Sequence, residues 1–261
     1  MTPFTYDDIA GMIDHALLHP TLSFDGLIEG CKLANLYRTA TVCVKPCDVK
    51  LASQFLINSS VDICTVIGFP HGANTVEIKT KETETACNDG AKEVDLVINL
   101  GRVMTEDWEY ITKEIETIHK AAHSFGAKLK VIFENDYWKE GAVNLSTEEV
   151  IEKLCQISVS AGADWVKTST GFGYVPQSDG SLKAHGATKH DVALMVRSCS
   201  CKAGVKAAGG VKDFSTLLAM RALGASRIGT SSSQKILEEC RNSLSLPHLS
   251  VEEKNTHFES Y

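Results

Sequence analysis

A Gly-Ala pair that recurs at regular intervals is the feature that most constrains how this chain can fold. The pair occurs at Gly90-Ala91, Gly126-Ala127, Gly162-Ala163 and Gly224-Ala225. The first three glycines are 36 residues apart, and the last lies 62 residues further on, close to two more units. Each pair follows a helical pattern, where glycine can end a helix in the left-handed conformation, and precedes a short β-branched run typical of a buried parallel strand. The repeat therefore predicts helices that alternate with parallel strands.

Extending this pattern along the chain gives eight candidate strands. They are expected at residues 12–18, 39–44, 62–68, 93–99, 128–134, 165–170, 204–208 and 226–230, with helical patterns that include 108–124, 147–161, 189–198 and 214–223. Eight alternating units in about 250 residues favour a (β/α)8 (TIM) barrel of the α/β class. We expect a single catalytic domain over residues 1–261, with a flexible C-terminal tail at about 246–261. An open doubly wound sheet is the alternative, and residues 12–18 could instead continue a helix from Tyr6.

Composition excludes several classes of protein. Hydrophobic residues make up 43% and charged residues 23%, which are ordinary values for a globular protein. The formal net charge of −7 and the lack of a basic run argue against nucleic acid as a partner. Nine cysteines, an odd number, fit free thiols in a reducing compartment better than a disulfide framework. Because the chain shows no secretory signal and no apolar run of about 20 residues, we expect a cytoplasmic protein without a membrane partner.

Three charged residues fall at strand positions that should face the barrel interior. Side chains alternate along a strand, so the apolar Val166 should face the helices and leave Lys167 pointing inward. By the same rule Lys206 on the next strand and Asp95 on the fourth strand should point inward. Burial and a neighbouring ammonium both disfavour the charged form of an amine and so release the lone pair of a nucleophile. The two lysines therefore indicate a nucleophilic amine, with a structural ion-pair network, or lysines that reach the barrel rim, as the alternative.

Two segments rich in glycine and serine are expected at the ends of the last two strands. Gly209 and Gly210 follow the seventh strand, and Gly229, Ser231 and Ser232 lie where the eighth strand ends and a helix begins. Glycines allow close backbone approach, and helix N-terminal N–H groups and serine hydroxyls favour an anion. Barrel phosphate sites commonly use the loops after these two strands. The segments predict a phosphate site, with an ordinary Gly-Gly turn and a serine helix cap as the alternative.

Other candidate ligands carry less weight. His119 and His123 lie four residues apart on a helix but are expected on its outer surface, solvated. His15 and His19 could be either core or rim. The close cysteine pairs lack a second ligand pair at zinc spacing. The sequence therefore implies no metal and no cofactor.

Seven motifs spread over nearly the whole chain resemble those of the 2-deoxyribose-5-phosphate aldolases, a family of class I aldolases with a TIM-barrel fold. They are Ile13-Asp14-His15, Val42-Cys43-Val44, Ile67-Gly68-Phe69-Pro70, Gly72-Ala73-Asn74-Thr75, Glu93-Val94-Asp95, Val166-Lys167-Thr168-Ser169-Thr170-Gly171 and Val205-Lys206-Ala207-Ala208-Gly209-Gly210. The Lys-Thr-Ser-Thr-Gly and Lys-Ala-Ala-Gly-Gly segments within the last two are highly specific in combination.

The resemblance implies a reversible reaction in nucleoside catabolism, in which 2-deoxy-D-ribose 5-phosphate gives acetaldehyde and D-glyceraldehyde 3-phosphate. It implies that Lys167 forms an imine with the substrate, that Lys206 tunes this amine, and that Asp95 transfers protons through water, while Asp14 supports the polar network. It assigns substrate and phosphate binding to Cys43, Thr170, Gly171, Gly209, Gly210, Gly229, Ser231 and Ser232. The C-terminal Tyr261 would be a proton shuttle, unless the terminus is frayed. A homodimer is the default assembly.

Four departures from the family pattern concern substrate detail. Phe172 stands where some members have a phosphate-binding lysine, and Lys45 stands where asparagine is common. Residues 173–185 form a longer loop, and the segment Glu134-Asn135-Asp136 is more acidic than a neutral aldehyde requires. Two other functions remain open: another imine-forming barrel, such as a transaldolase-like enzyme, or a catalytically idle barrel that binds sugar phosphates. The two inward lysines argue against the idle barrel, because buried charges are costly to keep.

Overall fold

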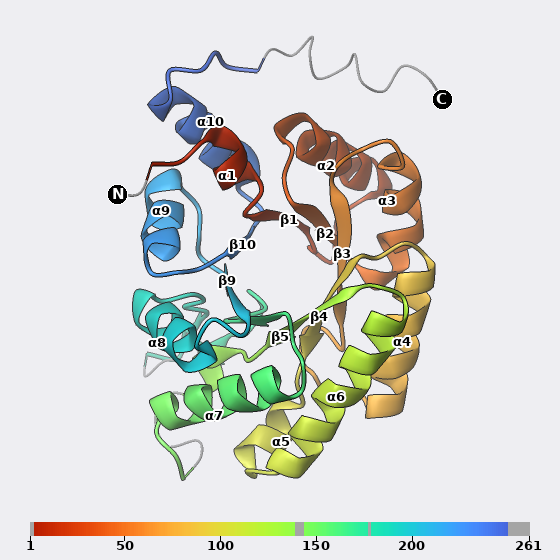
Figure 1. The fold of residues 1–261 in the computed structure, drawn as a ribbon, viewed down its shortest axis with the longest axis vertical. Helices are drawn as coiled ribbons and strands as arrows, with labels where there is room; N and C mark the ends of the chain where they lie inside the picture. The colour runs from red at the N-terminus through yellow and green to blue at the C-terminus, as the bar shows by residue number, and fades with distance from the viewer. Residues whose placement is uncertain (1–2, 139–143, 177–178, 250–261) are drawn as a thin grey trace.

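Parallel strands close into a barrel, and helices surround it (Figure 1). The structure is a computed structural model, which describes residues 3–138, 144–176 and 179–249. The barrel strands are β1 (Ile13–Leu17), β2 (Thr41–Val44), β3 (Asp62–Ile67), β4 (Glu93–Val97), β5 (Lys128–Ile132), β6 (Trp165–Lys167), β9 (Gly204–Ala208) and β10 (Arg227–Thr230). Their order around the barrel is β1-β10-β9-β6-β5-β4-β3-β2. Because β1 pairs with both β2 and β10, the sheet is closed, which confirms the predicted (β/α)8 barrel and excludes the open sheet.

The helices lie between the strands and agree closely with the predicted ones. They are α1 (Tyr6–Ala10), α2 (Phe24–Tyr37), α3 (Val49–Phe55), α4 (Val76–Asn88), α5 (Leu100–Met104), α6 (Trp108–Ser124), α7 (Thr147–Ser160), α8 (Lys189–Cys199), α9 (Phe214–Ala222) and α10 (Ser233–Ser243), with two short 3-10 helices, η1 (Pro46–Asp48) and η2 (Asn135–Trp138). The predicted helix at 108–124 is α6, and the other three agree within one residue at each end. Side chains of Ser146, Thr188 and Asp213 accept backbone N–H groups at helix starts, where those groups have no partner within the helix.

Within the predicted range 12–18, residues Ile13–Leu17 form a strand and do not continue the first helix. α1 begins after a capping box at Thr5 and gives way at Gly11. Two residues later the chain enters β1, where Ile13 pairs with Ile228 of β10. Strand β1 forms backbone hydrogen bonds with both β2 and β10, and the pairing with β10 closes the barrel. A continued helix could not form these hydrogen bonds.

The four Gly-Ala pairs adopt the conformation that their pattern predicts. The φ angles are +118° at Gly90, +72° at Gly126, +90° at Gly162 and +102° at Gly224. Residues with a Cβ atom rarely adopt such angles, whereas glycine adopts them readily. Each glycine thus turns the chain out of a helix, and the alanine that follows is buried at the start of the next strand segment.

Apolar side chains fill the space between the barrel and the helices, whereas charged side chains fill the centre of the barrel. On β4, Val94 and Leu96 belong to the apolar core, while the alternate residues Glu93 and Asp95 bond to groups from other strands. The prediction that β4 alternates in this way is therefore confirmed. Between β6 and β9 the register pairs Lys167 with Lys206, so two amines lie side by side on neighbouring strands.

The segment that follows β6, residues 171–187, includes the long loop expected at residues 173–185. It contains a short antiparallel hairpin of β7 (Val175–Pro176) and β8 (Leu182–Lys183). The pairing is only two residues long on each side, too short to give a periodic signal in the sequence.

Among the described residues, no helix has both the length and the apolar character needed to cross a membrane.

Candidate active site

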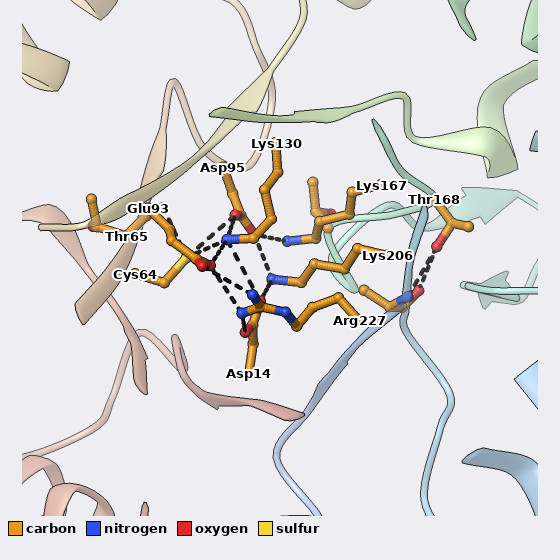
Figure 2. Close-up of polar contacts among 12 residues, drawn as sticks. Asp14, Cys64, Thr65, Glu93, Asp95, Lys130, Lys167, Thr168, Lys206 and Arg227 are labelled. Atoms are coloured by element: carbon orange, nitrogen blue, oxygen red, sulfur yellow. Dashed lines mark hydrogen bonds and ion pairs between the residues drawn. The ribbon is translucent and has the colours of Figure 1, made fainter. Parts of the chain in front are cut away.

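The three charged residues that were expected to face inward meet at the centre of the barrel (Figure 2). Lys167 Nζ lies 2.8 Å from Asp95 Oδ2, and Lys206 Nζ lies 2.7 Å from the same oxygen. Lys206 Nζ also donates to a carboxylate oxygen of Asp14 on β1. The relative exposures of Lys167, Lys206 and Asp95 are 3%, 1% and 0%. One carboxylate oxygen therefore lies between two buried amines.

Three further charged residues complete this cluster, and the sequence analysis missed them. Lys130 on β5 contacts Asp95 Oδ1 at 2.9 Å and Glu93 Oε2 at 2.6 Å. Arg227 on β10 makes two hydrogen bonds of 3.0 Å to Glu93 and one of 2.6 Å to Asp14. The signal for Lys130 was available, because it alternates with the apolar Leu129 and Val131 just as Lys167 alternates with Val166.

The charges of this cluster do not cancel if every member is ionised. Its carboxylates are Asp14, Glu93 and Asp95, and its cations are Lys130, Lys167, Lys206 and Arg227. A net charge inside a protein is costly, so three carboxylates and four cations are balanced when one lysine is neutral. Among the described residues, Lys167 contacts only one carboxylate, whereas Lys206 contacts two and Lys130 contacts three. Lys167 is therefore the lysine of this cluster with the fewest carboxylate partners.

Two groups in contact with one another beside Lys167, Asp95 and Lys206, have shifted pKa values. Burial by itself would raise the pKa of Asp95, but the surrounding ammonium groups, led by Lys130, hold it well below its usual range. Burial by itself would lower the pKa of Lys206, but the carboxylates of Asp14 and Asp95 outweigh burial and raise that pKa. Asp95 thus stays an anion and Lys206 stays a cation at neutral pH.

A cavity of about 270 Å³ lies at the carboxyl ends of the strands, above the two lysines. It is lined by Asp14, Ala16, Leu18, His19, Cys43, Lys167, Thr170, Gly171, Phe172, Lys206, Ala208, Gly209, Gly210, Val211, Lys212, Gly229, Thr230, Ser231 and Ser232. Every residue that the resemblance assigned to the substrate or its phosphate lines this cavity. Asp95 does not line it, because it is fully buried beneath the lysines.

One wall of the cavity offers backbone groups to an anion. Gly209 and Gly210 have φ angles of +87° and +80°, which glycine adopts readily and residues with a Cβ atom adopt rarely. Opposite them α10 begins at Ser233, and the side chain of Ser232 makes no capping hydrogen bond. The serine cap considered in the sequence analysis is thus not formed by Ser232. A helix N-terminus that Ser232 does not cap, beside a glycine turn, is a favourable site for phosphate.

His15 supports this wall from beneath. Its Nδ1 atom lies 2.9 Å from the Oγ atom of Ser233, the first residue of α10. Burial lowers the pKa of His15 to about 4, so its ring is neutral at physiological pH. Of the two histidines that were left as core or rim, His15 is buried and His19 lines the cavity.

We expect His15 to make the fold sensitive to mild acid. The unfolded chain takes up a proton near the ordinary histidine pKa of 6.5, whereas the folded chain resists protonation until about pH 4. Stability therefore falls as the pH drops below 6.5, by about 2 kcal/mol between pH 7.5 and pH 5. Urea unfolding at both pH values measures this loss, and the His15→Gln variant, which cannot titrate, should lose about 2 kcal/mol less. An equal loss in both proteins would show that His15 does not contribute.

The remaining candidate ligands lie apart from the cavity or are already neutralised. The rings of His119 and His123 contact each other at a tilt of 41° with centroids 3.9 Å apart, and His123 Nε2 lies 3.0 Å from Asp164 on the protein surface. Ligand atoms of Cys43, Cys64 and Asp95 lie within 4.8 Å of one another, but the lysines around Asp95 already balance its charge. Tyr261 and residues 250–261 of the predicted tail lie outside the described residues.

A closed barrel with a cavity at the carboxyl ends of its strands defines the class of TIM-barrel enzymes. The family of DeoC/LacD aldolases matches residues 11–239 of this chain. A deoxyribose-phosphate aldolase of Rhodopirellula baltica is 41% identical over 96% of this chain and 97% of its own length. One of Thermococcus gammatolerans is 44% identical over 90% of this chain and 97% of its own. The solved structure of a deoxyribose phosphate aldolase from Aeropyrum pernix, described as a tetramer, superposes with a TM-score of 0.79 and 30% identity, covering 92% of this chain and 93% of that one.

The chain belongs to the DeoC/LacD family of aldolases. It is accordingly a carbon–carbon lyase, and the resemblance identified in its sequence motifs is confirmed.

Proposed function

We propose that this enzyme reversibly cleaves 2-deoxy-D-ribose 5-phosphate into acetaldehyde and D-glyceraldehyde 3-phosphate, through an imine on Lys167. The observation that carries the proposal is the position of Lys167, which lines the cavity and is paired with a single carboxylate. Glycine and serine residues suited to binding a phosphate line the same cavity. The names of the relatives support the same substrate.

The reaction starts when the neutral amine of Lys167 attacks the C1 aldehyde of the open-chain sugar. Loss of water gives a protonated imine, which withdraws electrons from the C2–C3 bond. As that bond breaks, the C3 hydroxyl loses its proton and C3 becomes the aldehyde carbon of glyceraldehyde 3-phosphate. The electron pair is left on an enamine, which takes a proton at C2. Hydrolysis then releases acetaldehyde and restores the amine.

The charged neighbours of Lys167 serve the proton transfers. Asp95 and Lys206 remain ionised and share a hydrogen bond of 2.7 Å, so a water in the cavity can exchange protons with this pair. Asp14 keeps Lys206 in place through its own hydrogen bond. Tyr261 stays a prediction as a further proton shuttle.

The phosphate binds against Gly171, Gly209, Gly210, Gly229, Ser231 and Ser232 in this proposal. Backbone N–H groups and hydroxyls supply most of the contacts. Phe172 packs edge-on against Phe69, with ring centroids 5.5 Å apart, and brings no charge. Lys212 lines the same cavity and is the cation that we assign to the phosphate in place of a lysine at position 172. Thr170 and Cys43 contact the sugar.

The proposed setting of the reaction is a reducing cytoplasm. Free cysteines, nine of them among the described residues, fit a reducing cytoplasm. The substrate places the enzyme in nucleoside catabolism. A homodimer is the simplest symmetric assembly.

Trapping of the imine tests the proposed function. The enzyme is incubated with acetaldehyde and borohydride, and the modified residue is located by mass spectrometry. We expect a reduced adduct on Lys167 and cleavage of 2-deoxyribose 5-phosphate by the untreated enzyme. An adduct formed only with ketones would favour another imine-forming barrel. Binding of sugar phosphate without any adduct would favour a non-catalytic barrel.

A further inference from the structure

The acidic segment at the end of β5 has no part in the chemistry described above. Glu134 and Asp136 are only 1% and 2% exposed, and Asp136 Oδ1 lies 3.3 Å from His185 Nδ1. A buried carboxylate is costly unless its oxygens accept hydrogen bonds. The partners of these two carboxylates are therefore informative.

Glu134 holds the first end of the segment that follows β6. Its carboxylate accepts the backbone N–H of Thr170 at 3.1 Å and also accepts the Thr170 hydroxyl. That hydroxyl oxygen in turn accepts the N–H of Phe172 at 2.9 Å. Gly173 packs so closely that a Cβ atom there would lie 2.6 Å from the carboxyl carbon of Glu134. The chain around Gly171 is thus fixed against β5 on both sides.

Asp136 holds the other end of the same segment. Its Oδ2 atom accepts the N–H groups of His185 at 3.2 Å and of Gly186 at 2.9 Å. Beyond this point the N–H of Ala187 donates to the carbonyl of Gly209 at 3.1 Å. A Cβ atom on Gly186 would lie 2.5 Å from that carbonyl oxygen, so the two backbones are in direct contact. Asp136 therefore fixes the position of Gly209 through residues 185–187.

We infer that Glu134 and Asp136 are positioning residues for the phosphate of the substrate. The two carboxylates flank Asn135 and reach opposite ends of one loop, and each end borders the proposed phosphate site, at Gly171 and at Gly209. Displacing either end changes the spacing of backbone N–H groups across that site. The hydrogen bonds of these carboxylates go to the loop, whereas Lys167 donates to Asp95. This inference rests on the proposed function, since the anion in question is the phosphate of the substrate.

Asp136→Ala tests the inference by comparing two substrates. We expect KM for 2-deoxyribose 5-phosphate to rise about tenfold with little change in kcat, because two hydrogen bonds to a charged acceptor are lost. We expect kcat/KM for 2-deoxyribose, which lacks the phosphate, to stay unchanged. Asp136→Asn should restore most of the loss, since its amide oxygen can accept both N–H groups. Asp179→Ala is the matched control, because Asp179 is an exposed acid of the same loop that bonds only to Ser181 among the described residues.

Two further variants displace the ends of the same loop without removing Asp136. Gly186→Ala leaves the carboxylate in place but forces the loop away from Gly209, so the same phosphate-selective rise in KM is expected. Glu134→Gln keeps an acceptor for the Thr170 N–H but not for its hydroxyl, and should raise KM for the phosphorylated substrate by about threefold.

Calorimetric binding of inorganic phosphate separates this inference from the proposed function. We expect Kd for inorganic phosphate to weaken about tenfold in Asp136→Ala and not in Asp179→Ala, whatever the sugar substrate is. An equal fall in kcat/KM for both sugars, or unchanged phosphate binding, would overturn the positioning role. Failure of the wild-type enzyme to cleave the sugar, with phosphate binding altered as expected, would instead reject only the proposed function.

Discussion

Lys167→Leu is expected to abolish turnover of 2-deoxyribose 5-phosphate, with kcat reduced by at least about 10⁴-fold, or about 5.5 kcal/mol of activation free energy. The amine is the nucleophile of the proposed reaction, and leucine cannot form an imine. The fold should survive, because Asp95 keeps its contacts with Lys130 and Lys206. Steady-state cleavage assays measure the loss of turnover. Borohydride trapping measures imine formation, and no adduct should form with acetaldehyde.

Lys153→Leu is the matched control for this variant, because Lys153 is an exposed lysine on α7. It should retain wild-type activity and the adduct on Lys167. Appreciable cleavage by Lys167→Leu, or an unchanged yield of adduct, would remove Lys167 from the mechanism.

Lys206→Leu is expected to reduce kcat by about 10²- to 10⁴-fold, the usual range for loss of a group that takes part in proton transfer. Here the amine of Lys167 is still present, so acetaldehyde and borohydride should still label it, although more slowly. Leucine leaves Asp95 with two lysines and Asp14 with Arg227, Lys130 and Thr41. The variant thus separates imine formation from the later proton transfers.

Lys202→Leu, at an exposed position four residues earlier in the chain, serves as the control and should be fully active. Complete loss of labelling in Lys206→Leu would mean that Lys206 is needed for the first step. A wild-type rate would mean that the contact between Lys206 and Asp95 has no catalytic value.

Much of the fold could be predicted because its signals are local. Gly90, Gly126 and Gly162 each adopt a positive φ angle where a helix gives way to a strand, so this local signal recurs with the repeat. The hairpin in residues 171–187 was missed because two-residue strands have no periodicity to detect. Helix ends were predicted within one residue where a serine, threonine or aspartate side chain caps the first turn.

The candidate site was predictable only in part, for a different reason. Alternation along single strands was enough to turn Lys167, Lys206 and Asp95 inward. It does not reveal which carboxylate meets which amine, because those contacts join residues far apart in the sequence, such as Arg227 and Glu93.

The expected electrostatics also change once the contacts are known. Mutual repulsion of two amines was the basis of the sequence argument, whereas in the structure the Oδ2 atom of Asp95 lies between Lys167 and Lys206. The whole cluster, which includes Lys130, holds four cations against three carboxylates, and this excess replaces the repulsion between two amines as the electrostatic basis of the proposed nucleophile.

Sharing of Asp95 by three lysines has a consequence for how this enzyme can evolve or be redesigned. When residues share one partner, the effects of substituting them do not add. Epistasis should therefore be concentrated among the charged residues at the barrel axis. There, the effect of a substitution at Lys206 should depend on which residue stands at position 130. Libraries that vary these positions together will reach working combinations that stepwise single-site searches pass over.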